Sequence, residues 1–516
     1  MAVIDENKII MSNDFFNFNR LFYYCDNEYI VCSNRYHLIL LVLKEIGINC
    51  EINEEKAILN LSSVNIQFLT QNTLSEMDIK KVYKCVNSFD ISINSQGINF
   101  IENEYGKILN DNSYLDENEY RKMLYEGKNE LINNINSVLD KNEYKDVIID
   151  LTGGMDSRIV YGCALQNKNS KNKVYINSYA VSGSNDLDIA VQINSIYGLK
   201  WDTTNVERFA LDEKYSDAMQ RSFYMGIYYS HNIININNKV NDYTTKMIGA
   251  CGEILLRPYI VRKYFNTHLN DVKSATEFLD FILRDYSSEI IADYKAAKNF
   301  VNLHLKEFKN YINCSYFEII DRIYLEHRHG YHFDQGIISK HGILSIMPLQ
   351  SKKLFELHHK VYNKHKSIKL QLDVTSLLDP YLASIRYDDP KDNKDRNYLK
   401  DVLYYDKEYY RNIEINELND EDNEMKKYNE AIDEKHKNTK YIKNSMCLSS
   451  NIDFNHKILC DLRYICKNDK IICDNVGIAL YYYIKNNINK DSSKKRLRFL
   501  YNKINSLKDQ MIIFKK

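Results

Sequence analysis

The stretch that most constrains the fold is residues 145–165, which read KDVIIDLTGGMDSRIVYGCAL. Residues 147–151 form a short apolar run with β-branched side chains, a pattern typical of a strand buried on both faces of a parallel sheet. Gly153 and Gly154 then predict a tight turn, and apolar residues return at helical spacing after Ser157. A strand, a glycine turn and a helix in this order place backbone N–H groups and the positive end of a helix around one anion. The sequence therefore predicts a phosphate-binding loop within an α/β fold.

Neither a Walker loop nor a dinucleotide-binding fingerprint occurs in this stretch, because GK[ST] and GxGxxG are both absent. Residues 152–157, TGGMDS, instead resemble the SGGxDS loop of the ATP pyrophosphatases. The arginine that follows is similar to the flank of this loop in the asparagine synthetase and β-lactam synthetase family. The resemblance implies that the loop binds the pyrophosphate end of ATP through Thr152 (in place of the family's serine), Gly153, Gly154, Met155, Asp156 and Ser157, and that Asp156 also holds Mg²⁺. The residues alone leave a second interpretation open, in which Asp156 and Ser157 only cap the helix.

A second small-residue loop, residues 246–253 with the sequence KMIGACGE, resembles the GxGxDE segment that completes the Mg²⁺ and pyrophosphate site in the family. The resemblance implies that Gly249 approaches the phosphates. Gly252 stands where the family has aspartate, so Asp156 and Glu253 are the two carboxylates expected to hold Mg²⁺. This ion usually takes one or two carboxylates together with phosphate oxygens. A surface glutamate in a turn is the alternative for Glu253.

Three residues are predicted to act in catalysis. Residues 377–389 resemble the segment before the family's catalytic lysine, which makes Lys391 the first candidate and Lys394 its competitor, with a plain exposed loop as the alternative. Arg328 lies in a block similar to the family's arginine-rich helix, and its planar guanidinium suits a carboxylate or a triphosphate. A salt bridge on the helix face explains Arg328 equally well. The reaction also needs a base or a pair of groups that deprotonates the amine, and Glu326 with a nearby tyrosine is the candidate.

Two further features of this block bear on the site. His327, His329 and His332 do not predict a zinc site, because His327 does not share a helix face with the other two. Met347-Pro348-Leu349-Gln350-Ser351 resembles a Pro-Phe-Leu-Asp turn of the family, with Ser351 in place of the aspartate.

The region before the loop, residues 1–112, is expected to be an α+β domain with antiparallel strands. Residues 29–40, YIVCSNRYHLIL, resemble the middle of the N-terminal domain of asparagine synthetase relatives, which is a glutaminase in the glutamine-using members. That enzyme needs cysteine as its first residue after methionine removal. Here Ala2 follows Met1, so the resemblance implies a degenerate glutaminase-like domain without glutamine hydrolysis.

Residues 113–400 are expected to form the synthetase domain. Strands are predicted near 147–151, 173–181 and 200–206, with helices over 115–139, 157–165 and 186–197. This alternation predicts a doubly wound parallel sheet with a nucleotide at the carboxyl ends of its strands, its base near residues 178–181. The resemblance implies a fold of the adenine nucleotide α-hydrolase type. Residues 401–516 are expected to be a helical C-terminal extension of this domain.

Composition narrows the class of protein. The 516 residues are 44% hydrophobic and 27% charged, with a formal net charge of −1, which argues against nucleic acid or an acidic membrane surface as a partner. The eleven cysteines form no CxxC pair, and no apolar run has the ~18 residues of a membrane span. Charged residues interrupt the start of the chain, so we expect no signal peptide and a cytoplasmic location.

Together these features predict an ATP-dependent, AMP-forming ligase that acts in biosynthesis. It would adenylate the carboxylate of a small molecule or peptide and couple it to an amine to form an amide, with ATP and Mg²⁺ as cofactors. The resemblance also implies a homodimer. Two alternatives remain open: a nucleotide-binding pseudoenzyme or scaffold, favoured by the missing aspartate at position 252, and a sulfur-transferring ATP pyrophosphatase.

Overall fold

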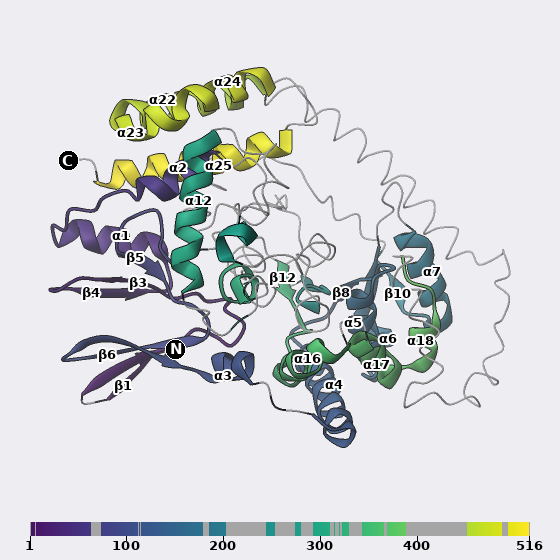
Figure 1. Cartoon of the computed structure of the whole chain (residues 1–516). Helices are drawn as coiled ribbons and strands as arrows, with labels where there is room; N and C mark the ends of the chain where they lie inside the picture. The colour runs from purple at the N-terminus through teal and green to yellow at the C-terminus, as the bar shows by residue number, and fades with distance from the viewer. Residues whose placement is uncertain are drawn as a thin grey trace.

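A computed structural model describes residues 2–5, 7–62, 74–111, 113, 115–178, 185–202, 244–252, 274–279, 293–309, 314, 319, 322–329, 343–365, 369–388, 451–487 and 494–514. The described elements form a mixed α/β protein with one parallel sheet and two antiparallel sheets. Figure 1 shows the antiparallel sheets at the left, the parallel sheet at the right, and the C-terminal helices above the N-terminal region.

The parallel sheet has five strands in the order β10-β9-β8-β11-β12. Their bounds are β8 Val147–Asp150, β9 Val174–Asn177, β10 Lys200–Trp201, β11 Thr244–Met247 and β12 Ile343–Ile346. All neighbouring strands run parallel. The chain places β9 and β10 on one side of β8 and then β11 and β12 on its other side. The direction in which strands are added therefore reverses between β8 and β11. The parallel sheet predicted from the sequence is confirmed.

Helices connect these strands as their periodicity predicts. Helix α4, Glu117–Leu139, leads into β8 and begins with a capping box between Asp116 and Glu119. Helix α5, Met155–Leu165, follows β8, and α6, Ser170–Lys173, precedes β9. Helix α7, Asp186–Tyr197, ends at Gly198, whose φ of 69° is the left-handed conformation that glycine accepts at a helix end. Of the predicted third strand, only Lys200–Trp201 lies within a described strand.

The N-terminal region contains the two antiparallel sheets, as predicted. One has the order β1-β2-β6-β7 and the other β4-β3-β5. Apolar residues of both sheets, among them Met11, Tyr23 and Ile91, pack into one cluster between them. The bounds are β1 Ala2–Asp5, β2 Lys8–Met11, β3 Phe22–Cys25, β4 Ile30–Ser33, β5 Val82–Lys84, β6 Phe89–Asn94 and β7 Gly97–Glu102, with helices α1 Tyr36–Glu45, α2 Glu54–Ser62 and α3 Glu104–Asn110.

The remaining elements are helical. They are α12 Asp293–Phe308, the π-helical turn η3 Tyr324–Arg328, α16 Lys352–His365, α17 Lys369–Leu378, α18 Pro380–Ser384, α22 Asn451–Asn468, α23 Lys470–Ile472, the π-helical turn η6 Cys473–Gly477, α24 Ile478–Asn487 and α25 Lys494–Phe514. Within the described ranges, no helix has both the length and the apolar character needed to cross a bilayer.

The C-terminal helices attach to the N-terminal region. Residues of α22, α24 and α25 share an apolar cluster with Ala57, Ile58 and Leu61 of α2. The sequence suggests that residues 401–516 extend the synthetase domain, whereas the described part of this segment packs on α2 and α1. Helical periodicity predicts the helices and their buried faces, but it carries no information on which partner covers those faces.

Candidate phosphate-binding site

Two loops meet at the point where the strand order of the parallel sheet reverses. Residues 151–154 follow the carboxyl end of β8, and residues 248–252 follow the carboxyl end of β11, its neighbour on the other side of the reversal. In open α/β sheets, the crevice outside the carboxyl ends of the strands at such a reversal is the usual ligand position. Both loops that the sequence singled out therefore lie at the expected ligand-binding edge.

Internal hydrogen bonds fix the first loop. The Thr152 N–H donates to the Ser157 hydroxyl oxygen at 3.0 Å, and the two hydroxyls lie 2.9 Å apart. The Gly154 N–H donates to Thr152 Oγ1 at 3.2 Å. Helix α5 then begins after Gly154, and no side chain caps it. The interpretation in which Asp156 and Ser157 only cap this helix is therefore not supported, and the helix start is suited to binding an anion.

Glycine is required where the two loops pack together. A Cβ added to Gly249 would lie 2.7 Å from the backbone nitrogen of Ser157, and one added to Gly252 would collide with the Asp156 carboxylate. An aspartate at position 252, as in the family, would therefore require the Asp156 side chain to move. The sequence pattern alone does not reveal this close approach.

Asp156 is held from a distant helix. The buried Gln371 side chain of α17 donates its amide N–H to Asp156 Oδ1 at 2.6 Å. No local pattern around Gln371 predicts this contact, because the two residues are 215 positions apart. The hydrogen bond fixes one carboxylate oxygen and therefore the direction of the other.

Arg158, the residue after the loop, joins the loop to the segment that follows α18. Its guanidinium is fully buried, donates to the backbone oxygens of Leu382, Ile385 and Arg386 at 3.2, 2.6 and 2.7 Å, and reaches the oxygen of Gly153 at 3.5 Å. It also stacks on the Tyr387 ring, 3.8 Å from the ring centroid. The planar fork of arginine suits such a set of converging acceptors. Arg158 thus supports the loop from the protein interior, and its buried guanidinium is not accessible to a ligand.

Two more aspartates surround Gly153. Its N–H donates to Asp186 Oδ1 at 2.7 Å, and its carbonyl accepts from the Asp388 N–H at 3.1 Å. Asp388 Oδ1 in turn accepts from the Asn185 N–H at 2.9 Å. Three carboxylates around an anion-binding helix start disfavour a free phosphate and favour an anion that carries a cation with it. The sequence shows an acidic residue at the start of α7, but it does not show that this side chain contacts Gly153.

Few side chains are expected to bind Mg²⁺ at this site. Of the two carboxylates expected to hold the ion, Asp156 is described, whereas Glu253 lies outside the described residues. Among the ranges that the structure describes, no group of three or more His, Cys, Asp or Glu side chains is arranged to hold a metal. One or two carboxylates with phosphate oxygens satisfy Mg²⁺, so the residues present fit an ion that arrives bound to ATP.

Among the three predicted catalytic residues, the structure describes the side chain of Glu326 alone. Glu326 is 2% exposed and accepts a hydrogen bond from the Ser88 hydroxyl in the N-terminal region. Arg328 is the last residue of η3, and its side chain is not described. Lys391, Lys394 and His332 lie outside the described residues. The structure therefore does not support Glu326 as the base that meets an incoming amine.

Ser351, which replaces the aspartate of the family's turn, has a structural contact. Its hydroxyl donates to Glu130 Oε2 at 2.7 Å and accepts from the Leu354 N–H at 3.1 Å. These bonds attach the start of α16 to α4. Arg322 likewise donates to the Asn110 side chain at 2.6 Å, so it joins this helical block to the N-terminal region.

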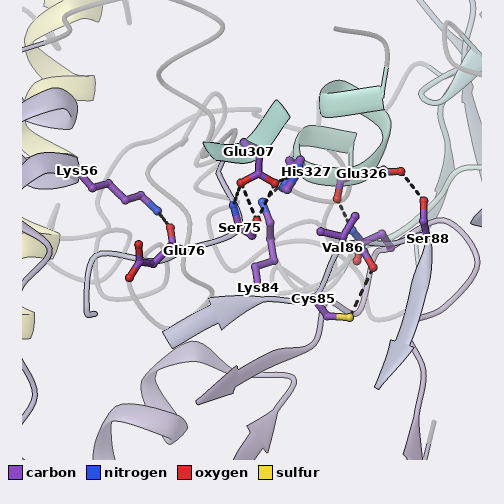
Figure 2. A network of polar contacts seen from close by, with 11 residues as sticks. Lys56, Ser75, Glu76, Lys84, Cys85, Val86, Ser88, Glu307, Glu326 and His327 are labelled. Carbon is purple, nitrogen blue, oxygen red and sulfur yellow. Dashed lines mark hydrogen bonds and ion pairs between the residues drawn. The ribbon is translucent and has the colours of Figure 1, made fainter. Parts of the chain in front are cut away.

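A separate polar network lies between the N-terminal region, α12 and η3 (Figure 2). Glu307 accepts from the Ser75 N–H at 2.9 Å and the Ser75 hydroxyl at 2.7 Å, and lies 3.2 Å from His327 Nε2. Lys84 Nζ donates to the His327 backbone oxygen at 3.5 Å. Lys84, Glu307, Glu326 and His327 are all buried. His327, one of the three histidines that do not predict a zinc site, is therefore part of this network.

Burial controls the protonation of this network. It lowers the pKa of His327 to about 4, an effect to which nearby Lys84 adds, and it lowers the pKa of Lys84 well below its usual range. Burial alone would raise the pKa of Glu307, but the contacts with His327 and Ser75 outweigh it and lower that pKa. Near neutral pH we therefore describe His327 as a neutral imidazole that hydrogen-bonds the Glu307 carboxylate.

Comparison with known proteins adds no relative. No protein-family model matches this chain, and no curated protein matches it. The resemblance to the asparagine synthetase family therefore rests on the loop residues and on their surroundings.

Proposed function

We propose that the protein is an ATP-dependent, AMP-forming ligase of the asparagine synthetase and β-lactam synthetase type, with an adenine nucleotide α-hydrolase-like fold. The observation that carries the proposal is the meeting of the 151–154 and 248–252 loops at the reversal of strand order, with Asp156 between them. In this proposal the N–H groups at the start of α5 bind the pyrophosphate end of ATP, and Asp156 with Glu253 holds Mg²⁺, which neutralises phosphate charge.

The reaction would join an acid to an amine. The substrate carboxylate attacks the α-phosphorus, the bond to pyrophosphate breaks, and the acyl-adenylate is then attacked by the amine to give an amide and AMP. Ser157 and Thr152 hold the loop closed, so the N–H groups at the start of α5 need not reorganise when charge moves to the leaving pyrophosphate. Binding both reactants in one site removes most of the entropic cost of the second step.

Lys391 remains the proposed catalytic lysine. Asp388, three residues earlier in the sequence, is hydrogen-bonded to Gly153, which supports a role for this segment at the site. Arg328 remains a candidate for the substrate carboxylate. The N-terminal region, with its two antiparallel sheets, fits a degenerate glutaminase-like domain whose remaining role is to support η3 through Ser88 and α12 through Ser75.

One observation favours a second candidate function, a nucleotide-binding scaffold without turnover. Asp156 Oδ1 already accepts a hydrogen bond from Gln371, and Gly252 has replaced the second acidic residue. A chain that retains the phosphate loop but lacks full metal coordination would bind ATP without cleaving it.

Mass spectrometry of nucleotides distinguishes the two functions. Purified protein is mixed with Mg-ATP and a pool of carboxylic acids and amines, alongside Asp156→Asn. AMP and pyrophosphate that form only with certain acids, and not in the variant, would support the ligase and identify its substrate. ADP would contradict it, and binding of Mg-ATP with no product from any acid in the pool would favour the scaffold.

A further inference from the structure

Two cysteines meet at a bend in the C-terminal helices, outside the candidate phosphate-binding site. Cys466 lies in the last turn of α22, and Cys473 is the first residue of η6. In an unbroken helix, residues seven positions apart would be separated by about 10 Å along the axis. Here the backbone is extended at Asp469, with a φ of −137° and a ψ of 104°, and the Asp469 side chain caps α23 by accepting from the Ile472 N–H at 3.0 Å. This break in the helix brings the two cysteines together.

The two sulfur atoms lie beside the same glycine. A Cβ added to Gly477 would lie 2.6 Å from Cys466 Sγ and 3.4 Å from Cys473 Sγ, and the two thiols are hydrogen-bonded to each other. Both cysteines are half-buried and present as free thiols. Glycine at position 477 therefore leaves the space in which one sulfur can approach the other.

The contact gives the two thiols different roles. Burial and the hydrogen bond to Cys473 raise the pKa of Cys466 to about 12. Cys466 therefore keeps its proton near neutral pH and donates its S–H to the Cys473 sulfur. Since a thiolate is the form that attacks a disulfide, Cys473 is the residue that attacks first and Cys466 the residue that attacks second.

We propose that Cys466 and Cys473 form a reversible thiol–disulfide site that reacts with low-molecular-weight disulfides. The Cys473 thiolate attacks one sulfur of such a disulfide, the external S–S bond breaks, and one half leaves as a thiolate. The Cys466 sulfur then attacks Cys473 in the mixed disulfide, forms the bond between the two residues and gives its proton to the departing second half. Two protein thiols are oxidised, and one external disulfide is reduced to two thiols. This proposal does not depend on the proposed catalytic activity.

The bond would fasten the bend where it packs on the N-terminal region (Figure 1). Ile465, Ile472 and Val476, which lie next to the two cysteines in the sequence or one turn away, are buried in the apolar cluster shared with α2. A covalent link across the bend reduces the conformational freedom of the unfolded chain. We therefore expect the oxidised protein to unfold at a higher temperature than the reduced protein. A lower unfolding temperature would show that the bond distorts the bend and would overturn the geometry on which the proposal rests.

Peptide mass spectrometry of the full chain tests the proposal. The protein is equilibrated with mixtures of reduced and oxidised glutathione, and the remaining thiols are then blocked with N-ethylmaleimide. Trypsin cleaves at the lysines between the two cysteines and releases them in separate peptides, residues 464–467 and residues 471–485. We expect these peptides to be joined by a disulfide at glutathione ratios that leave Cys460, an exposed thiol on α22, blocked by the reagent. Absence of the joined peptides at every ratio, or joining of either peptide to Cys460 as often, overturns the proposal.

Two controls separate the folded geometry from the closeness of the two residues in sequence. The bond should form at a ratio of oxidised to reduced glutathione about tenfold lower in the folded protein than in concentrated urea. Equal ratios would show that the fold does not position the pair and would overturn the proposal. Cys466→Ser should accumulate a mixed disulfide with glutathione on Cys473, whereas Cys473→Ser should leave Cys466 mostly unmodified, with thermal unfolding as the check that both variants fold. A mixed disulfide on Cys466 and none on Cys473 would contradict the proposed order of attack.

Discussion

The phosphate loop and the buried network of Figure 2 make opposite use of polar residues. The network contains lysines, glutamates, a histidine and serines, the residue types of many active sites, yet most of them are buried and they contact one another across α2, β5, α12 and η3. The loop contains two glycines and few ionisable groups, and it starts an uncapped helix at a sheet edge. The comparison teaches that an uncapped helix start at a sheet edge indicates a ligand site better than an accumulation of reactive side chains.

The two regions should therefore respond differently to mutation: changes in the network should affect stability, and changes at the loop should affect nucleotide binding. Four predictions test this division, from the largest expected effect to the smallest.

Removal of the Glu307 carboxylate should have the largest effect on stability. Glu307→Ala leaves the half-buried Ser75 and the buried His327 without their acceptor, and losing one member of such a set costs about 3–5 kcal/mol. Urea unfolding would measure the loss, and calorimetry would show unchanged affinity for Mg-ATP in the folded protein. The control is Glu51→Ala, which removes an exposed carboxylate 2.8 Å from Lys80 and should leave stability nearly unchanged. Equal effects of the two variants would contradict a stabilising role for the network.

Arg158 contributes both to the stability of the fold and to the position of the phosphate loop. Arg158→Lys keeps the charge but loses the fork that reaches four backbone oxygens, so we expect a loss of about 2–3 kcal/mol and a roughly tenfold weaker affinity for Mg-ATP. Tyr161→Phe is the matched control, because it removes a buried hydrogen bond of 2.8 Å to Asn194 from the same helix, away from the loop. It should lower stability without changing affinity. If Arg158→Lys binds Mg-ATP as tightly as the original protein, Arg158 does not position the loop.

Stability should also fall in acid over a defined pH range. Burial lowers the pKa of both His304 and His327 to about 4, whereas an unfolded chain protonates histidine near pH 6.5. Between these values the unfolded chain binds more protons, so the free energy of unfolding decreases as the pH falls from 6.5 to 4, by about 1.4 kcal/mol per pH unit for each histidine. Urea unfolding at several pH values measures the slope. His304→Phe should reduce it by about half, and an unchanged slope would show that His304 does not titrate as described.

The sequence predicted the elements around the loop because their signals are local. The buried run of β8, Gly153 and Gly154 and the periodicity of α5 lie within a few residues of one another, and the structure confirms the parallel sheet that they imply. Gly198 marked the end of α7 for the same reason. Antiparallel strands in the N-terminal region were also predictable from their short apolar runs.

Contacts between residues that are far apart in the sequence could not be predicted from these local signals. Gln371 on Asp156 and Asp388 on Gly153 depend on how α17 and the segment after α18 pack against the loop, which no local pattern encodes. Glu326, together with a nearby tyrosine, was predicted as a base because the reaction needs one, but its carboxylate accepts a hydrogen bond from Ser88, 238 residues away. The close approach of position 252 to the Asp156 side chain likewise follows from the packing of two loops.

Titration of Mg-ATP into the unmodified protein and into Asp156→Asn, followed by calorimetry with thermal unfolding of both proteins, tests the central claim most directly. Asparagine keeps an oxygen that can accept the Gln371 hydrogen bond but loses the charge that would hold Mg²⁺. We expect saturable binding to the unmodified protein, about 10- to 100-fold weaker binding to the variant, and similar unfolding temperatures. Absence of binding to the unmodified protein, or equal affinity in the two, would contradict the assignment of this loop as the nucleotide site.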